Sequence, residues 1–302
     1  MDFMLDVIAQ GLAYSILAIG VLLTYQVLDY ADLTVEGSFP LGAATGAICI
    51  VHGWNPFLAI VVAFFAGMLA GYATGFLHVK FKISSLLSGI LVMTAMFSVN
   101  LIVAGDKSNI GLFTYDTIFS YGPKIAANFN NNQWIIKLWP IFILLILVLV
   151  MKLLIDWFLG TKYGFLMRIT GDNPQLVATL GQDIGRIKMN GLAISNGYAA
   201  VSGAVVSQFL KFFDIQLGVG MIVLGLASVI IGLTVFKKIK FFGYTTSVIF
   251  GAITYRLAIA LALNVGLPTS YLKLVMAVIF VFVLVLGNGI MGKLFHRSVK
   301  ES

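Results

Sequence analysis

The stretch "TGDNPQLVATLG", Thr170 to Gly181, is a short polar segment between two long apolar runs. Pro174 suits the first position of a helix, because that position needs no backbone N–H. Asp172 or Asn173 can cap the N–H groups of the first turn. Gly181 fits the left-handed conformation that often ends a helix. The stretch therefore predicts a helix of about two turns, held between two longer helices.

The composition around this stretch is that of a membrane protein. Of 302 residues, 60% are hydrophobic and 10% are charged, with a mean hydropathy of +1.02. Soluble domains carry roughly 25% charged residues, and the apolar runs do not alternate as barrel strands do. Cys49 is the single cysteine, so no internal disulfide can form. We expect an all-α polytopic membrane protein, with residues 1–302 forming one transmembrane domain.

The apolar segments set the number of membrane spans at about 8–10, since a span needs roughly 20 apolar residues. The second and seventh segments are short and indicate short or broken helices. The nine segments cover about residues 7–28, 38–51, 56–79, 84–104, 135–157, 188–210, 219–236, 244–263 and 270–291.

The basic residues indicate an orientation with the N-terminus outside and the C-terminus inside. In that orientation 13 of the 19 Lys and Arg residues lie inside, 5 lie outside, and Arg256 lies within a span. This asymmetry follows the excess of positive charge on the cytoplasmic side of membrane proteins. It explains the net charge of +7 better than nucleic-acid binding does. The internal segment at about 161–188 contains the opening stretch, and the largest external loop is about 105–134.

Two stretches suggest an inverted repeat. Ala31–Gly46 reads "ADLTVEGSFPLGAATG" and leads into the second segment, while Phe213–Ser228 reads "FDIQLGVGMIVLGLAS" and leads into the seventh. Each has an Asp, then Gly, then a run rich in small residues. The two segments run in opposite directions in the expected topology. Short, Gly- or Pro-interrupted segments of inverted repeats line the transport path in many transporters.

Small residues at four-residue spacing predict close helix packing. They recur along one face of the third segment at Gly67, Gly71 and Gly75, and in the second at Gly42 and Gly46. Lipid supplies no hydrophobic force between helices, so small residues that let backbones approach stabilise the bundle. We expect most of these stripes to pack within the chain; one could instead join two copies.

At Gly164–Phe209, "GFLMRITGDNPQLVATLGQDIGRIKMNGLAISNGYAAVSGAVVSQF", the chain resembles the permeases of ATP-binding-cassette (ABC) importers of the branched-chain amino acid and simple-sugar group. The stretch "DLTVEGSFPLGAA", Asp32–Ala44, is similar to the tryptophan/tyrosine transport branch. Branched-chain amino acid permeases usually carry a neutral Ala-His-Gly type stretch in place of Asp32–Gly37. This difference bears on the cargo rather than on the fold.

The resemblance implies that the internal helix couples the chain to a cytoplasmic ABC ATPase, which binds ATP and magnesium. It also implies a second permease copy, an extracellular substrate-binding protein and a place in the bacterial cytoplasmic (inner) membrane. The cargo would be a small polar metabolite, an amino acid and possibly an aromatic one, carried inward by alternating access. The coupling residues implied are Arg168, Asp172, Asn173, Pro174, Gln175, Leu176, Ala178 and Gly181.

No motor or catalytic group is expected in the chain itself. "GNGIMGKL", Gly287–Leu294, has the spacing of a phosphate-binding loop, but Leu294 replaces the Ser or Thr that would hold magnesium. A membrane segment also precedes it, where the motif requires a strand. We expect no cofactor and no catalytic residue. The three histidines show no metal-ligand spacing.

Charged residues in or near the membrane are the candidates for the substrate path. Arg256 lies near the middle of the eighth segment, where a charge must face protein or water. Its candidate partners are Asp32, Glu36 and Asp214. Gly37 and Pro40 suggest a broken helix with exposed backbone around Glu36, where a ligand ammonium could bind. The candidate path residues are Asp32, Glu36, Ser38, Asp214 and Arg256.

A second function stays open on the sequence alone. An ion-coupled secondary transporter with inverted repeats would need no ATPase. It would place Asp32, Glu36 or Asp214 at the coupling-ion site.

Overall fold

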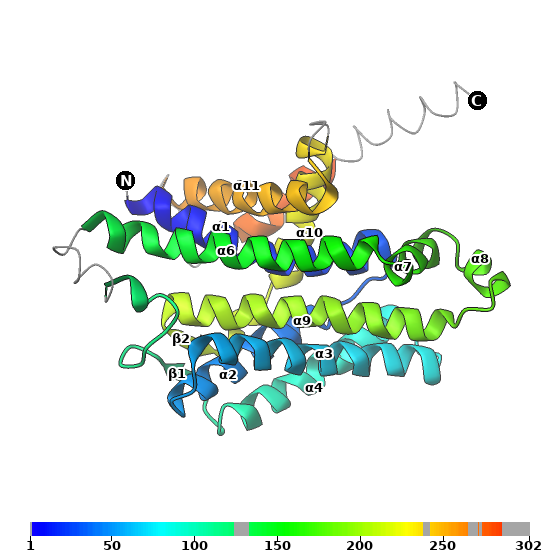
Figure 1. Ribbon diagram of the computed structural model, residues 1–302, viewed down its shortest axis with the longest axis horizontal. Coiled ribbons are helices and arrows are strands. Elements are labelled where there is room, and N and C mark those ends of the chain that lie inside the picture. The colour runs from blue at the N-terminus through cyan, green and yellow to red at the C-terminus, as the bar shows by residue number, and fades with distance from the viewer. Residues whose placement is uncertain (1, 124–132, 238–241, 265–270, 272–273, 286–302) are drawn as a thin grey trace.

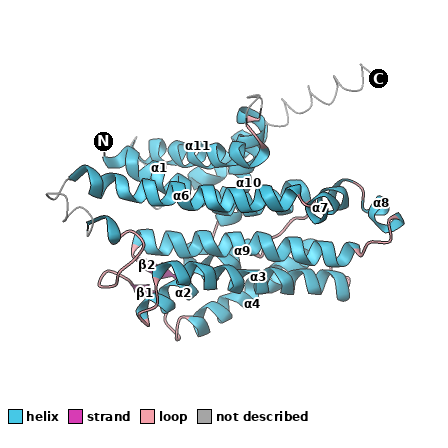
Figure 2. Ribbon diagram, viewed as in Figure 1, coloured by secondary structure: helices cyan, strands magenta, loops and turns pink. Residues whose placement is uncertain are grey.

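Helices make up most of the described chain (Figure 2). The computed structural model describes residues 2–123, 133–237, 242–264, 271 and 274–285. The expected all-α polytopic membrane fold is confirmed. Outside the described residues lie the phosphate-loop-like stretch at Gly287–Leu294, part of the predicted external loop and the end of the ninth segment.

The helices follow the predicted apolar segments closely. Three short segments of the described chain, labelled η, differ from α-helices: the first and third are π-helices, and the second is a 3₁₀ helix. The helices are α1 (Asp2–Leu22), η1 (Leu23–Val27), α2 (Val35–Val51), α3 (Pro56–Lys80), α4 (Ser85–Val103), α6 (Gln133–Gly160), α7 (Lys162–Asp172), α8 (Pro174–Thr179), α9 (Ile184–Leu210), η2 (Ile215–Gly218), α10 (Met221–Ile231), η3 (Gly232–Phe236) and α11 (Tyr244–Asn264).

Among the described residues, 6 helical segments are long and apolar enough to cross a membrane. Two further apolar helices, Val35–Val51 and Leu274–Val285, are shorter. The sixth predicted span corresponds to α9, which is less apolar because it lies inside the bundle and not against lipid. Its polar side chains bond to neighbouring helices: Ser195 donates to the carbonyl of Gly20 at 2.8 Å, and Ser202 to that of Ala13 at 2.8 Å.

The centre of the bundle is α9, with α2 and α3 against one side and α1 against another (Figure 1). Small residues allow this packing, as predicted. A Cβ on Gly71 of α3 would overlap the carbonyl of Leu192, and one on Gly203 of α9 would overlap that of Phe39. The predicted small-residue stripes are therefore contacts within the chain at these positions.

The two ends of the bundle differ. One end carries the N-terminal end of α1 and a pair of short antiparallel strands, β1 (Asn109–Gly111) and β2 (Phe212–Asp214). Helices α7 and α8 lie at the opposite end (Figure 1). The strands join the loop after α4, predicted to be external, to the end of α9; Ile110 lies opposite Phe213, and both side chains are buried. The sequence did not predict this pairing.

The two stretches of the predicted inverted repeat begin in the same way. Asp32 Oδ1 accepts a hydrogen bond from the N–H of Thr34 at 2.9 Å, and Asp214 Oδ1 accepts one from the N–H of Gln216 at 2.7 Å. Each aspartate thus caps a turn that leads into a short helix, α2 or, through η2, α10. The overall symmetry of an inverted repeat stays a prediction.

Candidate transport path and coupling surface

The helix predicted at Pro174 forms as α8, and its caps are those expected. Asn173 Oδ1 accepts from the N–H of Leu176 at 3.2 Å. Gly181 has φ +69°, the left-handed conformation that glycine favours. Asp183 Oδ1 accepts from the N–H of Arg186 at 3.1 Å and so starts α9. Asp172 ends α7 instead of capping α8.

The side chains of α8 divide into an inner and an outer set. Val177 is fully buried, whereas Leu176 is 46% exposed and Leu180, just after the helix, is 55% exposed. Gln175 and Ala178 are also exposed. Exposed leucines on a short helix at one end of the bundle give that end an apolar surface suited to contact with another protein.

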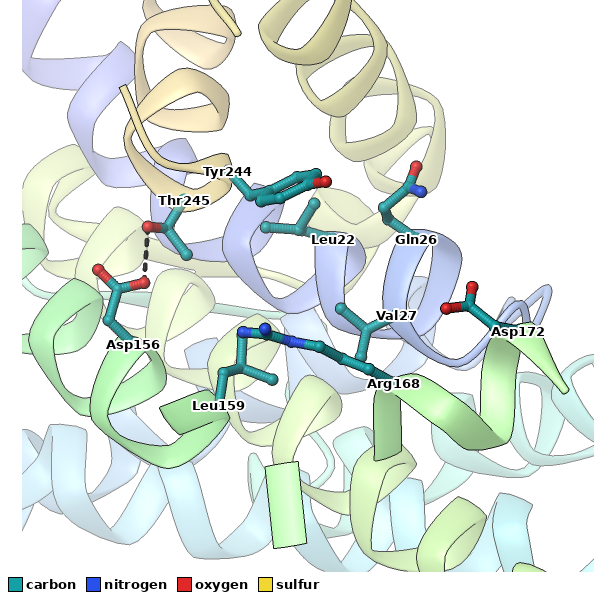
Figure 3. A pocket seen from close by; sticks show the side chains of 9 residues that line it. All are labelled: Leu22, Gln26, Val27, Asp156, Leu159, Arg168, Asp172, Tyr244 and Thr245. Atoms are coloured by element: carbon teal, nitrogen blue, oxygen red, sulfur yellow. Dashed lines mark hydrogen bonds between the residues drawn. The ribbon is translucent and has the colours of Figure 1, made fainter. Parts of the chain in front are cut away.

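Arg168 and Asp172 of α7 line a cavity between η1, α6, α7 and the start of α11, to which α8 contributes no residue. Figure 3 shows both side chains around this cavity of about 330 Å³, with Arg168 extending toward Leu159. Across the cavity Asp156 accepts from the hydroxyl of Thr245 at 2.7 Å. The cavity is lined by Leu22, Gln26, Val27, Asp156, Leu159, Arg168, Asp172, Tyr244 and Thr245. The predicted coupling residues therefore fall into two groups on adjacent surfaces.

Helix α7 joins α8 to the end of the first span. Gly171 lies so close to η1 that a Cβ would overlap the carbonyl oxygen of Val27. On the other side, Asn190 Nδ2 of α9 donates to the Tyr163 hydroxyl at 2.7 Å. Burial raises the pKa of the Tyr163 phenol, while the bond from Asn190 lowers it. Helix α7 thus contacts both the end of the first span and α9.

The candidate path residues do not form a single site. Asp32 is only 3% exposed, and its Oδ2 accepts from Nδ2 of Asn196 at 2.7 Å. Ser38 donates to Oδ1 of the same Asn196 at 2.6 Å. These groups satisfy one another inside the bundle, and they hold the start of α2 against α9.

Glu36 lies apart from that network. The predicted helix break falls before Val35 and not around Glu36, because α2 runs through Pro40 without interruption. Glu36 Oε1 accepts from the N–H of Gly220 at 3.1 Å, at the start of α10. Glu36 also lines a cavity of about 310 Å³ between α2, α4 and η2.

Asn100 of α4 lines the same cavity. Its Nδ2 donates to the carbonyl oxygen of Gly37 at 3.1 Å. Its side chain is buried, and its Oδ1 has no hydrogen-bond partner among the described residues.

The two remaining candidates each bond to a residue far away in the sequence. Asp214 caps η2 and accepts from Nδ2 of Asn109 at 3.4 Å, across the strand pair. Arg256 donates from Nε to Oε1 of Gln10 at 2.8 Å and lies 5.2 Å from the centre of the Tyr14 ring. The predicted acidic partners of Arg256 were wrong, because α11 packs along α1 and brings a neutral amide level with the guanidinium.

The sequence model of the branched-chain amino acid transport system permease component matches residues 3–284. The chain belongs to this permease family. It is 42% identical to a tyrosine transport system permease protein of Clostridioides difficile (strain R20291), over 95% of this chain and 92% of that protein. An uncharacterised protein of Rickettsia prowazekii (strain Madrid E) is 29% identical, over 92% and 95%. A probable branched-chain amino acid transport permease of Methanocaldococcus jannaschii is 25% identical, over 81% and 78%.

The permease is thus a multi-pass membrane protein, and its named relatives are transport subunits. Two residues of its interior escaped the sequence reasoning, Asn100 and Asn196, because charged groups and Ser38 were the candidates considered there and no amide was. Each is a neutral amide residue within an otherwise apolar or small-residue run, and this pattern could have pointed to a buried polar role. No cluster of three metal-binding side chains occurs in the part of the permease that the structure describes.

Proposed function

We infer that this permease is the transmembrane subunit of an ABC importer that carries tyrosine or a closely related amino acid inward. The observation that supports it most is the 42% identity to a tyrosine transport permease over 95% of the chain. Similarity of that extent covers the whole bundle and not one motif.

The energy would come from a cytoplasmic ATPase that binds ATP and magnesium and docks on α8. The capped helix with exposed Leu176 and Leu180 supports this role, because it offers a rigid apolar surface at one end of the bundle. Binding to the ATPase would displace α8, and α7 would pass the displacement to η1 through the contact of Gly171 with Val27. Alternating access would follow from the resulting shift of the spans.

A second permease copy would complete the path, and an extracellular binding protein would deliver the cargo at the end that carries β1 and β2. The surface formed by α4 and η2 is the proposed contact with the second copy. The polar side chains of Thr94 and Gln216 are exposed on this surface, which supports the proposal. Polar side chains at membrane depth face protein or water in preference to lipid. The assembly would lie in the bacterial cytoplasmic membrane.

Reconstitution tests this function directly. The permease is purified with its ATPase, placed in liposomes with the binding protein, and assayed for uptake of labelled tyrosine. We expect uptake that needs ATP, magnesium and all three components. Uptake by the permease alone without ATP would overturn the proposal and favour an ion-coupled secondary transporter.

A further inference from the structure

The cavity between α2, α4 and η2 has the lining of a site for a cation with an apolar body. Glu36 is the one ionisable side chain among the described residues that line it, so these residues give it a formal negative charge. Asn100, Thr94 and Gln216 add neutral polar groups. The apolar part of the lining comes from Pro40, Met93, Phe97, Ile215 and Val219.

Hydrogen-bond acceptors gather at the Glu36 side of the cavity. The backbone carbonyl oxygen of Glu36 lies at the contact between α2 and η2. Gly218 allows η2 to approach that oxygen, which a Cβ would overlap. Oδ1 of Asn100 is a buried acceptor without a partner among the described residues. An unpaired buried acceptor costs free energy that a donor group would recover.

We propose that this cavity binds the ammonium group of the transported amino acid, with Glu36 and Asn100 as its acceptors. An ammonium carries three donors and no acceptor, which matches this set. A carboxylate accepts about four hydrogen bonds, so the bond from Gly220 to Glu36 Oε1 is compatible with a ligand on the same group. Phe97 and Met93 contact the apolar body.

This assignment rests on the proposed function, since it takes an amino acid as the cargo. It also predicts which half of the amino acid is recognised here. A ligand with an ammonium and no carboxylate binds, whereas a ligand with a carboxylate and no ammonium is repelled by Glu36.

Two probes separate these cases. Tyramine has the phenol ring and the ammonium, and 3-(4-hydroxyphenyl)propionate has the ring and the carboxylate. We expect tyramine to raise the Tm of the purified permease in nanodiscs and the propionate to leave it unchanged. Equal stabilisation by both probes would overturn the proposal.

Glu36→Gln is the main variant, because Gln keeps an oxygen that can accept from Gly220 while losing the charge. We expect it to raise the half-saturating tyramine concentration by about tenfold or more, the size of effect that a charge-assisted hydrogen bond gives. Asn100→Leu should weaken tyramine binding as well. Ser98→Ala, an exposed site on α4 outside the cavity lining, is the control. An unchanged tyramine response in Glu36→Gln would overturn the proposal.

Uptake in liposomes distinguishes a failure here from a failure of the proposed function. If the native assembly imports tyrosine and Glu36→Gln imports it with the same KM, the ammonium site is wrong and the function stands. If the native assembly imports no tyrosine while tyramine binds in a manner that depends on Glu36, the site stands and the cargo is wrong.

Discussion

Gly42 marks a close approach of α2 to α9, because a Cβ there would overlap the backbone of Ala200. We expect Gly42→Ala to lower the stability of the permease by about 1–3 kcal/mol, the usual cost of overpacking. The backbone of α9 cannot yield as a flexible side chain could. Gly160→Ala is the matched control, since no atom lies within 4 Å of its added Cβ. The check is the Tm in detergent; an unchanged Tm for Gly42→Ala would contradict the packing.

Asn196 should contribute more to the stability of the permease than its neutral side chain suggests. It donates to the buried carboxylate of Asp32 and accepts from Ser38. We expect Asn196→Ala to cost about 1–3 kcal/mol, because it leaves buried polar groups unpaired. Asn196→Asp should be worse, as it would place a second carboxylate beside Asp32. The Tm of each variant in detergent tests this, and Asn196→Asp more stable than Asn196→Ala would argue against the bond to Asp32.

Residues with local partners were predictable, and residues with distant partners were not. Asn173 and Gly181 cap α8 through neighbours three positions away, so the sequence alone revealed their roles. Arg256 meets Gln10, which is 246 positions away. Only the packing of α11 on α1 brings those two residues together, and no local pattern encodes it.

Helix α8 is the element whose surface is proposed to bind the ATPase. Its outer leucines and its inner valine allow the two roles of the helix to be separated. We expect Leu176→Asp to weaken co-purification with the ATPase while the permease keeps its Tm, because Leu176 is 46% exposed. Val177→Asp should instead destabilise the permease, since Val177 is fully buried. Full ATPase binding by Leu176→Asp would count against docking on this surface.

The caps of α8 give a second test at this scale. Asn173→Ala together with Pro174→Ala removes the hydrogen bond to the N–H of Leu176 and the preformed first turn. We expect the double variant to associate less with the ATPase or to hydrolyse ATP without transport. The measurement is ATPase activity and uptake in the same liposomes. Unchanged coupling would exclude a need for a rigid α8.

Local sequence patterns predicted the helices of this fold but not the contacts between distant elements. Apolar runs predicted every described span, because burial in lipid requires length and hydropathy that are visible locally. The pairing of β1 with β2 was missed, since it joins segments about a hundred positions apart. Glu36 was predicted as a candidate residue, but the cavity that it lines was not. Three separate elements form that cavity, so no single stretch of sequence reveals it.

At the scale of the whole molecule, the orientation in the membrane is the largest untested prediction. The structure places the strand pair and α8 at opposite ends of the bundle, and the distribution of Lys and Arg predicts which end is outside. Cys49 is the single cysteine and is buried, so Cys49→Ala gives a background for labelling. Ser108→Cys and Gln175→Cys then place one thiol at an exposed site at each end.

We expect a membrane-impermeant maleimide to label Ser108→Cys in intact cells and Gln175→Cys only after the membrane is opened. The reason is that the Lys and Arg excess keeps the α8 end in the cytoplasm, where an ATPase can reach it. The reverse pattern would put the N-terminus inside and leave α8 without access to cytoplasmic ATP. That result would remove the physical basis for coupling through α8, even if the permease still carried tyrosine.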